Sequence, residues 1–525
     1  MLPRSNAARL LALVFLASPL QGEVVLPKVF TPHMVLQRGM AVPVYGTAAP
    51  GEKVAVKFRD QSLTATAGPD GKWLVKLAAL EAGGPEVLTI GDRQIEDVLV
   101  GDVWIGSGQS NMDMPVSAYL AGDPVLAEAA RGSYPKIRLM KKGAKDAWQE
   151  ATPDSIAGFS ALLFSFGFPL QKDLDVPVGL MVGAVGGTPS GFWLSEDMFR
   201  GDPACAGVVA EFEKSPEHGV LIERYNAAKA KFDQEQAAWQ PLAAAAKQEG
   251  KTPPPAPRPP KPPGKAGEAE KGKIGQLFEA HIRPYVGFGI KGVLWDQGES
   301  RTNIIGVDQV TLMGALVGGW RKAWGQGDFP FLYVQKPSGG GCAFDNSQPE
   351  NRLAEKFAPL PGTIPRGPGA DYSHEVFLRI MKYPNTHMVT SSDLGAGIHP
   401  ANKSGYGARA VQVALATAYG RKNEYLGPVY SSHKIAGDKV TLNFTHTGKG
   451  MAFKDGGAPQ GFMIAGEDKK FVWADARIEG DTVVLSSAKV PQPAAARYAW
   501  SNSFPWANLF NRDGLPAQPF RTDSW

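Results

Sequence analysis

The chain has 525 residues, which is too long for a single hydrophobic core and predicts about two to four domains. Hydrophobic residues make up 43% of it and charged residues 20%, a composition typical of a folded globular protein rather than a disordered one. The net charge of +4 is small for this length, and no basic block interleaved with aromatic residues occurs outside one proline-rich segment. The composition therefore argues against a nucleic-acid-binding protein.

The first residues have the pattern of an export signal. Arg4 and Arg9 precede or border the apolar run 10–17, and small residues follow that run. The run is too short to cross a bilayer, so it predicts a cleaved signal peptide over residues 1–22 rather than a membrane anchor. We therefore expect an exported protein, periplasmic or extracellular, that is not inserted in a membrane once the signal is removed.

The chain has two cysteines, Cys205 and Cys342. Disulfides persist in oxidising compartments, so an even pair in an exported protein is compatible with one bridge. Their separation in the sequence does not test the geometry that a bridge needs, and both the free and the bridged states stay open at this point.

Short alternating runs of apolar and polar residues occupy the chain from residue 23 to residue 100. The clearest runs, separated by turn residues, are 41–46, 53–58, 72–77 and 86–90. A period of two and turns at this spacing are expected of antiparallel strands. The pattern predicts an N-terminal β-sandwich domain over residues 23–100, with a scaffold role favoured over a sugar-binding one.

From residue 101 to residue 422 the pattern changes to strand-like apolar runs that alternate with longer amphipathic stretches. The runs are 102–105, 136–140, 178–184, 292–295, 329–334 and 386–390, and the helical candidates include 275–282 and 406–419. This alternation predicts an α/β domain in which helices cover both faces of a parallel sheet. In such folds the catalytic groups gather at the carboxyl ends of the strands.

Two other segments differ from this α/β pattern. Residues from about 220 to 270 combine an Ala-rich helical stretch with eight prolines between 253 and 263, which predicts an exposed insertion that includes extended chain. After residue 423 short strand-like runs return, at 439–444, 461–464, 481–486 and 496–500. They predict a C-terminal β domain over residues 423–525.

Four runs of the predicted α/β domain are followed by unusual polar clusters. These are Gln109-Ser110-Asn111, Gly186-Gly187-Thr188, Asp296-Gln297-Gly298-Glu299-Ser300, and Asp393 with Gly397-Ile398-His399-Pro400. Because the carboxyl ends of parallel strands share one edge of a sheet, we expect the clusters to converge on one crevice. A serine hydroxyl becomes a nucleophile when an imidazole takes its proton, and His399 is the histidine best placed to serve Ser110. Backbone N–H groups of Ser110 and of Gly187 or Gly186, and the side-chain amide of Gln297, are suitable oxyanion donors.

These four clusters, with the flanking segments 35–38 and 508–523, resemble the sialate O-acetylesterase family of the SGNH hydrolase superfamily. The resemblance covers nearly the whole mature chain apart from the proline-rich insertion. It implies a three-layer α/β domain with no metal and no cofactor, and the removal of O-acetyl groups from a carbohydrate through an acetyl-serine intermediate.

The resemblance also implies roles for individual residues. Ser110 would be the nucleophile and His399 the general base, and Ser110, Gly187 and Gln297 would supply the oxyanion donors. Of the residues in the matching clusters and near them, we expect Asn111, Glu299 and Trp193 to contact the substrate.

Two positions depart from the family pattern. Ala396 and Gly397 stand where related hydrolases usually place an aspartate two or three residues before the histidine, and the nearest upstream acid is Asp393. The second departure is Asp296, where the family usually has an aromatic residue. Three alternatives are open for the group that orients the histidine: Asp393, which we prefer; Glu299 or another acid; or a backbone carbonyl, in which case serine and histidine act as a dyad.

The sequence therefore predicts an exported serine esterase that deacetylates a carbohydrate, such as acetylated sialic acid, xylan or a similar glycan. The alternative from another class is a non-catalytic glycan-binding protein that retains the fold. An esterase for lipids or thioesters would need a long apolar groove, which no sequence feature demands. His281, His374 and His387 lack the short spacing to cysteine or carboxylate partners that a zinc site needs, so no metal site is expected. The sequence makes no prediction of the oligomeric state.

Overall fold

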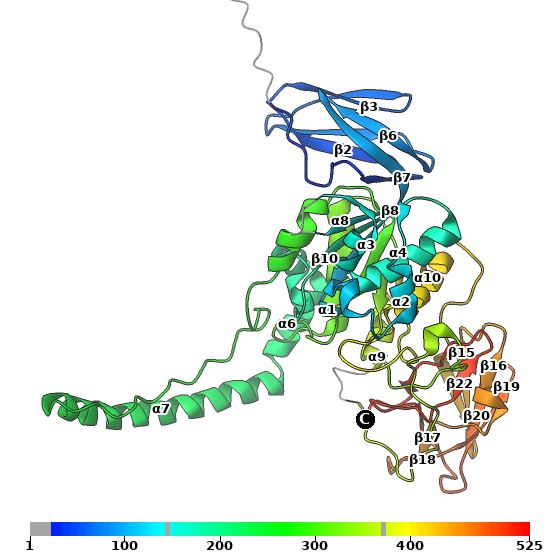
Figure 1. The fold of residues 1–525 in the computed structure, drawn as a ribbon. Helices are drawn as coiled ribbons and strands as arrows, with labels where there is room; N and C mark the ends of the chain where they lie inside the picture. Colours follow the sequence, from blue (N-terminus) through cyan, green and yellow to red (C-terminus); the bar gives the residue numbers. More distant parts are fainter. Residues whose placement is uncertain (1–22, 142–146, 369–373) are drawn as a thin grey trace, which may run out of the picture.

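The computed structural model describes residues 23–141, 147–368 and 374–525. In these ranges the chain folds into an N-terminal β region, a central α/β region and a C-terminal β region, and one long helix protrudes from the body (Figure 1). The expected signal peptide, residues 1–22, lies outside the described residues. None of the helices in these ranges is long and apolar enough to cross a membrane.

Six strands and the first half of a seventh build the N-terminal region. The six are β1 (Val35–Gln37), β2 (Val42–Thr47), β3 (Lys53–Phe58), β4 (Gln61–Thr66), β5 (Lys72–Leu77) and β6 (Gly83–Ile90). β2 pairs antiparallel with β5, and β3 pairs antiparallel with β4 and β6. In β5 the side chains of Trp73, Val75 and Leu77 are buried while those between them are exposed, as a period of two requires.

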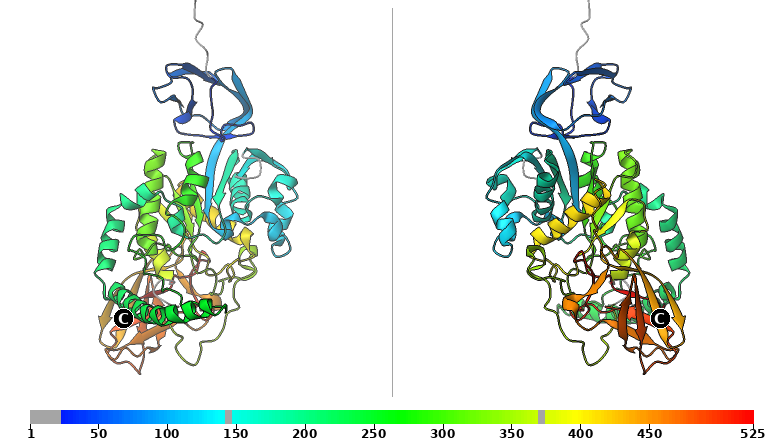
Figure 2. Two further views of the ribbon diagram at one scale, coloured as in Figure 1. Left: turned by 90° about the vertical axis from the view of Figure 1, so that its left-hand side faces the viewer. Right: turned by 90° about the vertical axis from the view of Figure 1, so that its right-hand side faces the viewer.

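The seventh strand, β7 (Arg93–Gly108), belongs to both the N-terminal and the central region (Figure 2). Its first half pairs antiparallel with β6, and from Asp102 onward it pairs in parallel with a strand of the central sheet. The sequence predicted a domain boundary at residue 100, but the strand passes that position without a break. Every residue from 98 to 108 is buried, so this stretch offers no exposed turn or linker at which the two regions separate.

The central sheet has the strand order β13-β12-β11-β7-β10-β8-β9, in which all neighbours are parallel except β8 and β9. Its other strands are β8 (Tyr134–Lys141), β9 (Gln149–Ala151), β10 (Val178–Ala184), β11 (Gly292–Asp296), β12 (Phe331–Val334) and β13 (Thr386–Val389). Alternate side chains of β11 point to opposite faces, so Leu294 packs in one hydrophobic core and Val293 in another.

Helices cover both faces of this sheet. α4 (Ala161–Leu174) and α10 (Lys403–Thr417) pack against each other in one core, and α8 (Gln309–Trp324) contributes to the other. The shorter helices are α1 (Ser110–Asp113), α2 (Pro124–Ala129), α3 (Pro153–Ala157), α5 (Glu196–Arg200), α6 (Pro203–Glu213), α9 (His374–Ile380), η1 (Val116–Ala118), η2 (Ser190–Phe192), the π-helix η3 (Phe278–Ile282), η4 (Arg283–Tyr285) and η5 (Pro349–Asn351). The prediction of an α/β protein with parallel strands and additional β sheets is confirmed.

The long helix α7 (Pro216–Gln248) and the proline-rich chain after it form an arm that projects from the central region (Figure 1). Ala243 is the one buried residue of this helix. The indole N–H of Trp239 donates to the carbonyl of Pro254 at 2.7 Å, so the extended chain returns along the helix. The closely spaced prolines of 253–263 favour extended chain, which explains why this segment is not helical.

The C-terminal region contains three small antiparallel sheets and the short helix η7 (Lys454–Gly456). Its strands are β14 (Val429–Ala436), β15 (Lys439–Thr445), β16 (Met451–Phe453), β17 (Phe462–Ala465), β18 (Val472–Trp473), β19 (Asp475–Glu479), β20 (Thr482–Ser486), β21 (Ala495–Tyr498), β22 (Leu509–Asn511) and β23 (Phe520–Arg521). The side-chain amide of Gln518 accepts from Gln335 at 2.8 Å and donates to Thr390 at 3.0 Å. These two residues follow β12 and β13, so the C-terminal region is tied to the end of the sheet where the polar clusters lie.

Both cysteines are buried and free. Cys205 lies in α6, and the thiol of Cys342 lies 3.4 Å from the carbonyl of Ala507. Burial raises the pKa of each thiol to about 12, so both are neutral at physiological pH. The two residues are not bridged to each other.

Candidate active site

The strand β7 delivers Ser110 to the carboxyl edge of the central sheet. The strand ends at Gly108, whose φ is +128°, and a Cβ at this position would lie 2.1 Å from the carbonyl oxygen of Asp296. Only glycine fits such a close approach between two strand ends. The N–H of Gln109 then donates to that same carbonyl at 2.9 Å, and Ser110 begins the short helix α1.

The structure brings Ser110 and His399 together although 289 positions separate them in the sequence. His399 lies in the loop between β13 and α10, and its Nε2 is 2.8 Å from the hydroxyl oxygen of Ser110. Ser110 is half-buried and His399 is exposed, so the pair is open to solvent on one side. This is the distance and the atom pairing that proton transfer from a serine hydroxyl to an imidazole requires.

The loop after β10 lies beside Ser110. A Cβ on Gly186 would lie 3.5 Å from the Cβ of Ser110, and Gly187 has a φ of +71°. In the described part of the chain no acceptor bonds to the backbone N–H groups of Ser110, Gly186 or Gly187. Free backbone donors next to a nucleophile are what an oxyanion needs.

Two side chains hold this loop in place. The hydroxyl of Thr188 donates to the carbonyl of Val185 at 2.7 Å, and the indole N–H of Trp193 donates to the Thr188 hydroxyl at 3.1 Å. Trp193 is fully buried, with its ring edge-on to that of Trp295 at 6.2 Å between centroids. The expectation that Trp193 contacts substrate is therefore corrected: its ring is in the core because the surrounding aromatic side chains enclose it.

Gln297 also differs from the sequence-based expectation. Its side chain is fully buried, and its amide nitrogen donates to the carbonyl oxygens of Arg301 at 3.2 Å and of Thr188 at 3.4 Å. Both amide hydrogens are thereby used to join two loops. In this arrangement Gln297 holds the glycine loop, and the unengaged donors beside Ser110 are backbone N–H groups.

Asp393 does not orient His399. Its carboxylate is fully buried, and its two oxygens accept from the guanidinium of Arg409 at 3.2 and 2.9 Å. Arg409 lies on α10, whose packing against the sheet brings its side chain to the end of β13. Across the ranges that the structure describes, His399 forms a single hydrogen bond, the one to Ser110.

A buried group of charges lies behind the Ser110 segment. The ammonium of Lys336 is 2.7 Å from Asp296 and 2.8 Å from Glu299, and Gln109 donates its side-chain amide to Glu299. Burial favours the neutral form of Glu299, but the Lys336 ammonium outweighs it and lowers the pKa of this carboxyl below its usual value. Asp296, the second departure from the family pattern, is thus one partner of a buried ion pair.

Sequence reasoning missed Lys336, although a signal for it existed. It stands two residues after the apolar strand β12, which is the same position relative to its strand that the other polar clusters occupy. Glu299 was expected to contact substrate. Its carboxylate instead pairs with Lys336 and accepts from the side-chain amides of Gln109 and, at 3.2 Å, of Asn111.

Asn111 is buried and fully engaged within the protein. Its amide nitrogen donates to the carbonyl of Ile398 at 2.8 Å, and its amide oxygen accepts from the ammonium of Lys403 at 2.7 Å. The expectation that Asn111 contacts substrate is corrected for this reason. Lys403, like Lys336, was not predicted from the sequence.

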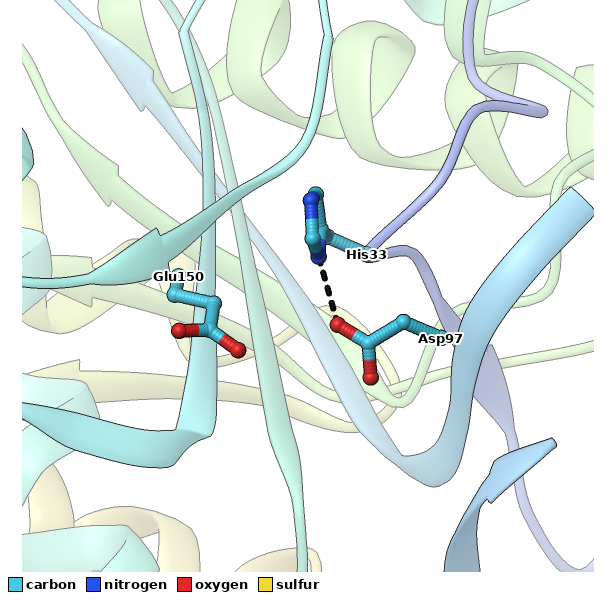
Figure 3. A group of neighbouring side chains, drawn as sticks. All are labelled: His33, Asp97 and Glu150. Atoms are coloured by element: carbon cyan, nitrogen blue, oxygen red, sulfur yellow. Dashed lines mark hydrogen bonds and ion pairs between the residues drawn. The ribbon is translucent and has the colours of Figure 1, made fainter.

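One group of side chains in the described ranges has a spacing suited to a metal ion, at the junction of the N-terminal and central regions. It consists of His33, Asp97 and Glu150 (Figure 3). The guanidinium of Arg138 lies among them, with its Nη1 2.6 Å from Asp97, 3.2 Å from Glu150 and 3.1 Å from the Nδ1 of His33. A cation would have to displace this charge, so the residues present suit an ion-pair junction better than a metal site.

The chain is similar to known carbohydrate esterases over most of its length. A rat sialate O-acetylesterase is 27% identical over 93% of this chain and 92% of its own length, and the mouse enzyme is 26% identical over 93% and 92%. A solved structure of a carbohydrate acetylesterase from Xanthomonas citri is 28% identical, covers 96% of this chain and 100% of its own, and superposes with a TM-score of 0.69. No protein-family model matches the chain.

The rat and mouse enzymes and the solved structure thus match over almost the full length of the chain. The resemblance inferred from those clusters and the flanking segments is confirmed, and the protein is a homologue of the sialate O-acetylesterases.

Proposed function

We propose that the protein is a carbohydrate O-acetylesterase that works through an acetyl-serine intermediate. The observation that carries the proposal is the 2.8 Å contact between the Ser110 hydroxyl and Nε2 of His399, next to unengaged backbone N–H groups. The names of the relatives, sialate O-acetylesterase and carbohydrate acetylesterase, support the substrate class. The order of the sheet and the helices on both its faces support an SGNH-type three-layer domain.

In the first half of the reaction Ser110 attacks the carbonyl carbon of the acetyl ester while His399 takes the hydroxyl proton. The N–H groups of Ser110 and of Gly187 or Gly186 stabilise the negative oxygen of the tetrahedral intermediate. The bond between the carbonyl carbon and the sugar oxygen then breaks. The sugar oxygen leaves with the electron pair and takes the proton from the His399 imidazolium, which leaves an acetyl group on Ser110.

In the second half a water molecule replaces the sugar. His399 takes a proton from the water as it attacks the acetyl carbon, and the same N–H groups hold the second oxyanion. Collapse of this intermediate breaks the bond to the Ser110 oxygen, which regains its proton from His399. Acetate is released and the free enzyme is restored.

The catalytic pair acts as a dyad in this proposal, because Asp393 is held by Arg409 and does not contact the imidazole. Ile398, adjacent to His399, is 71% exposed and is an apolar side chain at the edge of the site. We place it against the substrate. The export signal expected in residues 1–22 makes the proposed location periplasmic or extracellular, where acetylated polysaccharides and sialic acids are accessible.

The proposal is tested with Ser110→Ala. Among the described residues Ser110 supplies the one hydroxyl that bonds to His399. The variant is therefore expected to fold and to lose acetate release from a chromogenic acetyl ester, acetylated xylan and acetylated sialic acid. A phosphonofluoridate probe is expected to label Ser110 in the unaltered protein. Ser432→Ala, at an exposed position on β14, serves as the matched control and should keep full activity.

Retained turnover in folded Ser110→Ala would rule out the serine mechanism. Complete inertness of the unaltered protein, combined with binding of the glycans, would support the non-catalytic glycan-binding alternative instead.

A further inference from the structure

The geometry leaves open what holds His399 in line with Ser110. Related hydrolases usually use a carboxylate shortly before the histidine, and this chain has Ala396 and Gly397 there. Asp393, the nearest upstream acid, is committed to Arg409. His399 is also exposed, so core packing does not enclose its ring.

Asn111 joins the segment of the nucleophile to the segment of the base. It directly follows Ser110, and its amide nitrogen donates to the carbonyl of Ile398 at 2.8 Å. That carbonyl belongs to the peptide group that ends at the nitrogen of His399. The hydrogen bond from Asn111 fixes the plane of this peptide group and thereby restricts the backbone of His399. The donor is the residue next to Ser110, so the bond links the base directly to the segment of the nucleophile.

Lys403 in turn fixes Asn111. Its ammonium donates to the amide oxygen of Asn111 at 2.7 Å, and it lies over the rings of Tyr119 at 4.8 Å and Tyr406 at 5.8 Å. The residue is 1% exposed, and among the described residues no carboxylate lies within ion-pair distance of its nitrogen. Burying an ammonium beside a neutral amide costs folding free energy, because the amide replaces only part of the hydration that the ammonium loses.

The surroundings of Lys403 make it a rigid anchor. It is the first residue of α10, and the side chain of Asn402 caps that helix while donating to the carbonyl of Leu394 at 3.0 Å. The loop 394–402, which carries His399, is therefore tied at its far end to the same helix terminus. Burial lowers the pKa of Lys403 to about 7, against the opposing effect of the carboxylate of Asp296.

We propose that Lys403 is a positioning residue that acts through Asn111 to hold His399 against Ser110, in the place of the missing carboxylate. The assignment rests on the serine mechanism proposed above. The nitrogen of Lys403 donates to the Asn111 amide oxygen whether or not it is protonated, and this bond strengthens the one from Asn111 to the Ile398 carbonyl, since linked hydrogen bonds reinforce one another. These two linked hydrogen bonds fix the position of His399 without placing a negative charge beside its imidazolium.

The test compares Lys403→Met, Asn111→Ala and the double variant with the unaltered protein. Turnover is normalised to the active sites that a phosphonofluoridate titrates, so that partial unfolding does not count as lost catalysis. We expect Lys403→Met to lower kcat about a hundredfold with little change in KM, as a small misplacement of a catalytic group does. The double variant should lose little more than the worse single variant, because both act on one contact.

Lys454→Met is the matched control. Lys454 is also a buried lysine, and its ammonium donates to the carbonyl of Phe344 at 2.9 Å in the C-terminal region. Its replacement should leave kcat per titrated site unchanged. If Lys403→Met does not fold, Lys403→Gln is used: its amide is neutral and one bond shorter, so it fills most of the space but loses the 2.7 Å contact, and kcat should still fall.

The outcomes separate this assignment from the mechanism on which it rests. Turnover retained by Ser110→Ala would reject both. Loss of turnover in Ser110→Ala together with normal kcat per titrated site in a Lys403 variant would reject the role of Lys403 alone. Losses that add in the double variant would show that Lys403 does not act through Asn111, and would also overturn the assignment.

Discussion

At the scale of single residues, the site depends on which partner each buried polar side chain has found. Asp393 and His399 are six positions apart, yet the carboxylate bonds to Arg409 and the imidazole to Ser110. A carboxylate gains more from a bidentate guanidinium in the same buried environment than from a solvent-exposed imidazole. The nearness of Asp393 to His399 in the sequence therefore does not translate into a catalytic contact.

Asp393→Asn is expected to lower stability more than catalysis. It leaves the nearly buried guanidinium of Arg409 without its counter-charge, which typically costs about 3–5 kcal/mol of unfolding free energy. The kcat of the folded fraction should stay close to that of the unaltered protein. Chemical denaturation and active-site titration measure the two effects separately.

The double variant Asp393→Leu/Arg409→Met is the control for that prediction. Replacing both charges removes the uncompensated ion and should recover much of the lost stability. A large fall in kcat for a fully folded Asp393→Asn protein would instead show that Asp393 orients His399.

At the scale of elements, the arm formed by α7 and the proline-rich chain stands apart from the rest of the fold. The arm begins directly after α6, and its other end returns to that helix, where Val209 lies 3.3 Å from a Cβ built at Gly267. Between these ends the helix buries one residue, Ala243. The arm therefore buries little hydrophobic surface and contributes little to the stability of the body.

Replacing residues 216–263 with a short Gly/Ser linker is expected to leave both the melting temperature and the turnover of a small acetyl ester unchanged. The reason is that the arm shares almost no buried surface with the body. Thermal unfolding and acetate release check this. A lower melting temperature in the shortened protein would mean that the arm packs against the body or against another copy in solution.

At the scale of the whole molecule, the N-terminal and central regions share a strand and an ion-pair junction. β7 runs through both sheets, and Arg138 of β8 bonds to Asp97 of β7 with its two nitrogens at 2.6 and 3.0 Å. Arg138 also lies 3.2 Å from Glu150 of β9 (Figure 3 shows both carboxylates). Two regions joined in this way should unfold together.

Arg138→Met is expected to destabilise both regions at once. It leaves Asp97 and Glu150 without the buried guanidinium, and a hydrogen bond to a charged group contributes about 1.5–3 kcal/mol. Calorimetry should show one transition shifted to lower temperature. Arg131→Met is the control: Arg131 pairs with Glu128 on the surface, where an exposed pair contributes little, so the melting temperature should not move. Two separate transitions in Arg138→Met would show that the regions unfold independently.

The positions of Ser110 and of the glycine loop were predictable from the sequence because each follows an apolar run closely. A strand that ends in Gly-Gln-Ser or in Gly-Gly-Thr has its position at the sheet edge set by local pattern. The structure brings Ser110 and Gly186 together for that reason, whereas His399 reaches Ser110 from within the loop between β13 and α10. The surroundings of Gln297, Trp193 and Asn111 were not predictable in this way, since Thr188, Trp295 and Lys403 reach them from distant segments. Asp393 was not predictable either, because the packing of α10 on the sheet brings Arg409 to it.

By itself the sequence determined the α/β class, the strand ends that carry the polar clusters, and the relationship to the sialate O-acetylesterases. These follow from periodicity and short motifs, which act over a few residues. Only the tertiary structure decided that Asp393 belongs to Arg409 and that Lys403 reaches Asn111. A buried charge takes whichever partner the packing of helices on the sheet brings within hydrogen-bonding distance, and that packing is set by side chains hundreds of positions away.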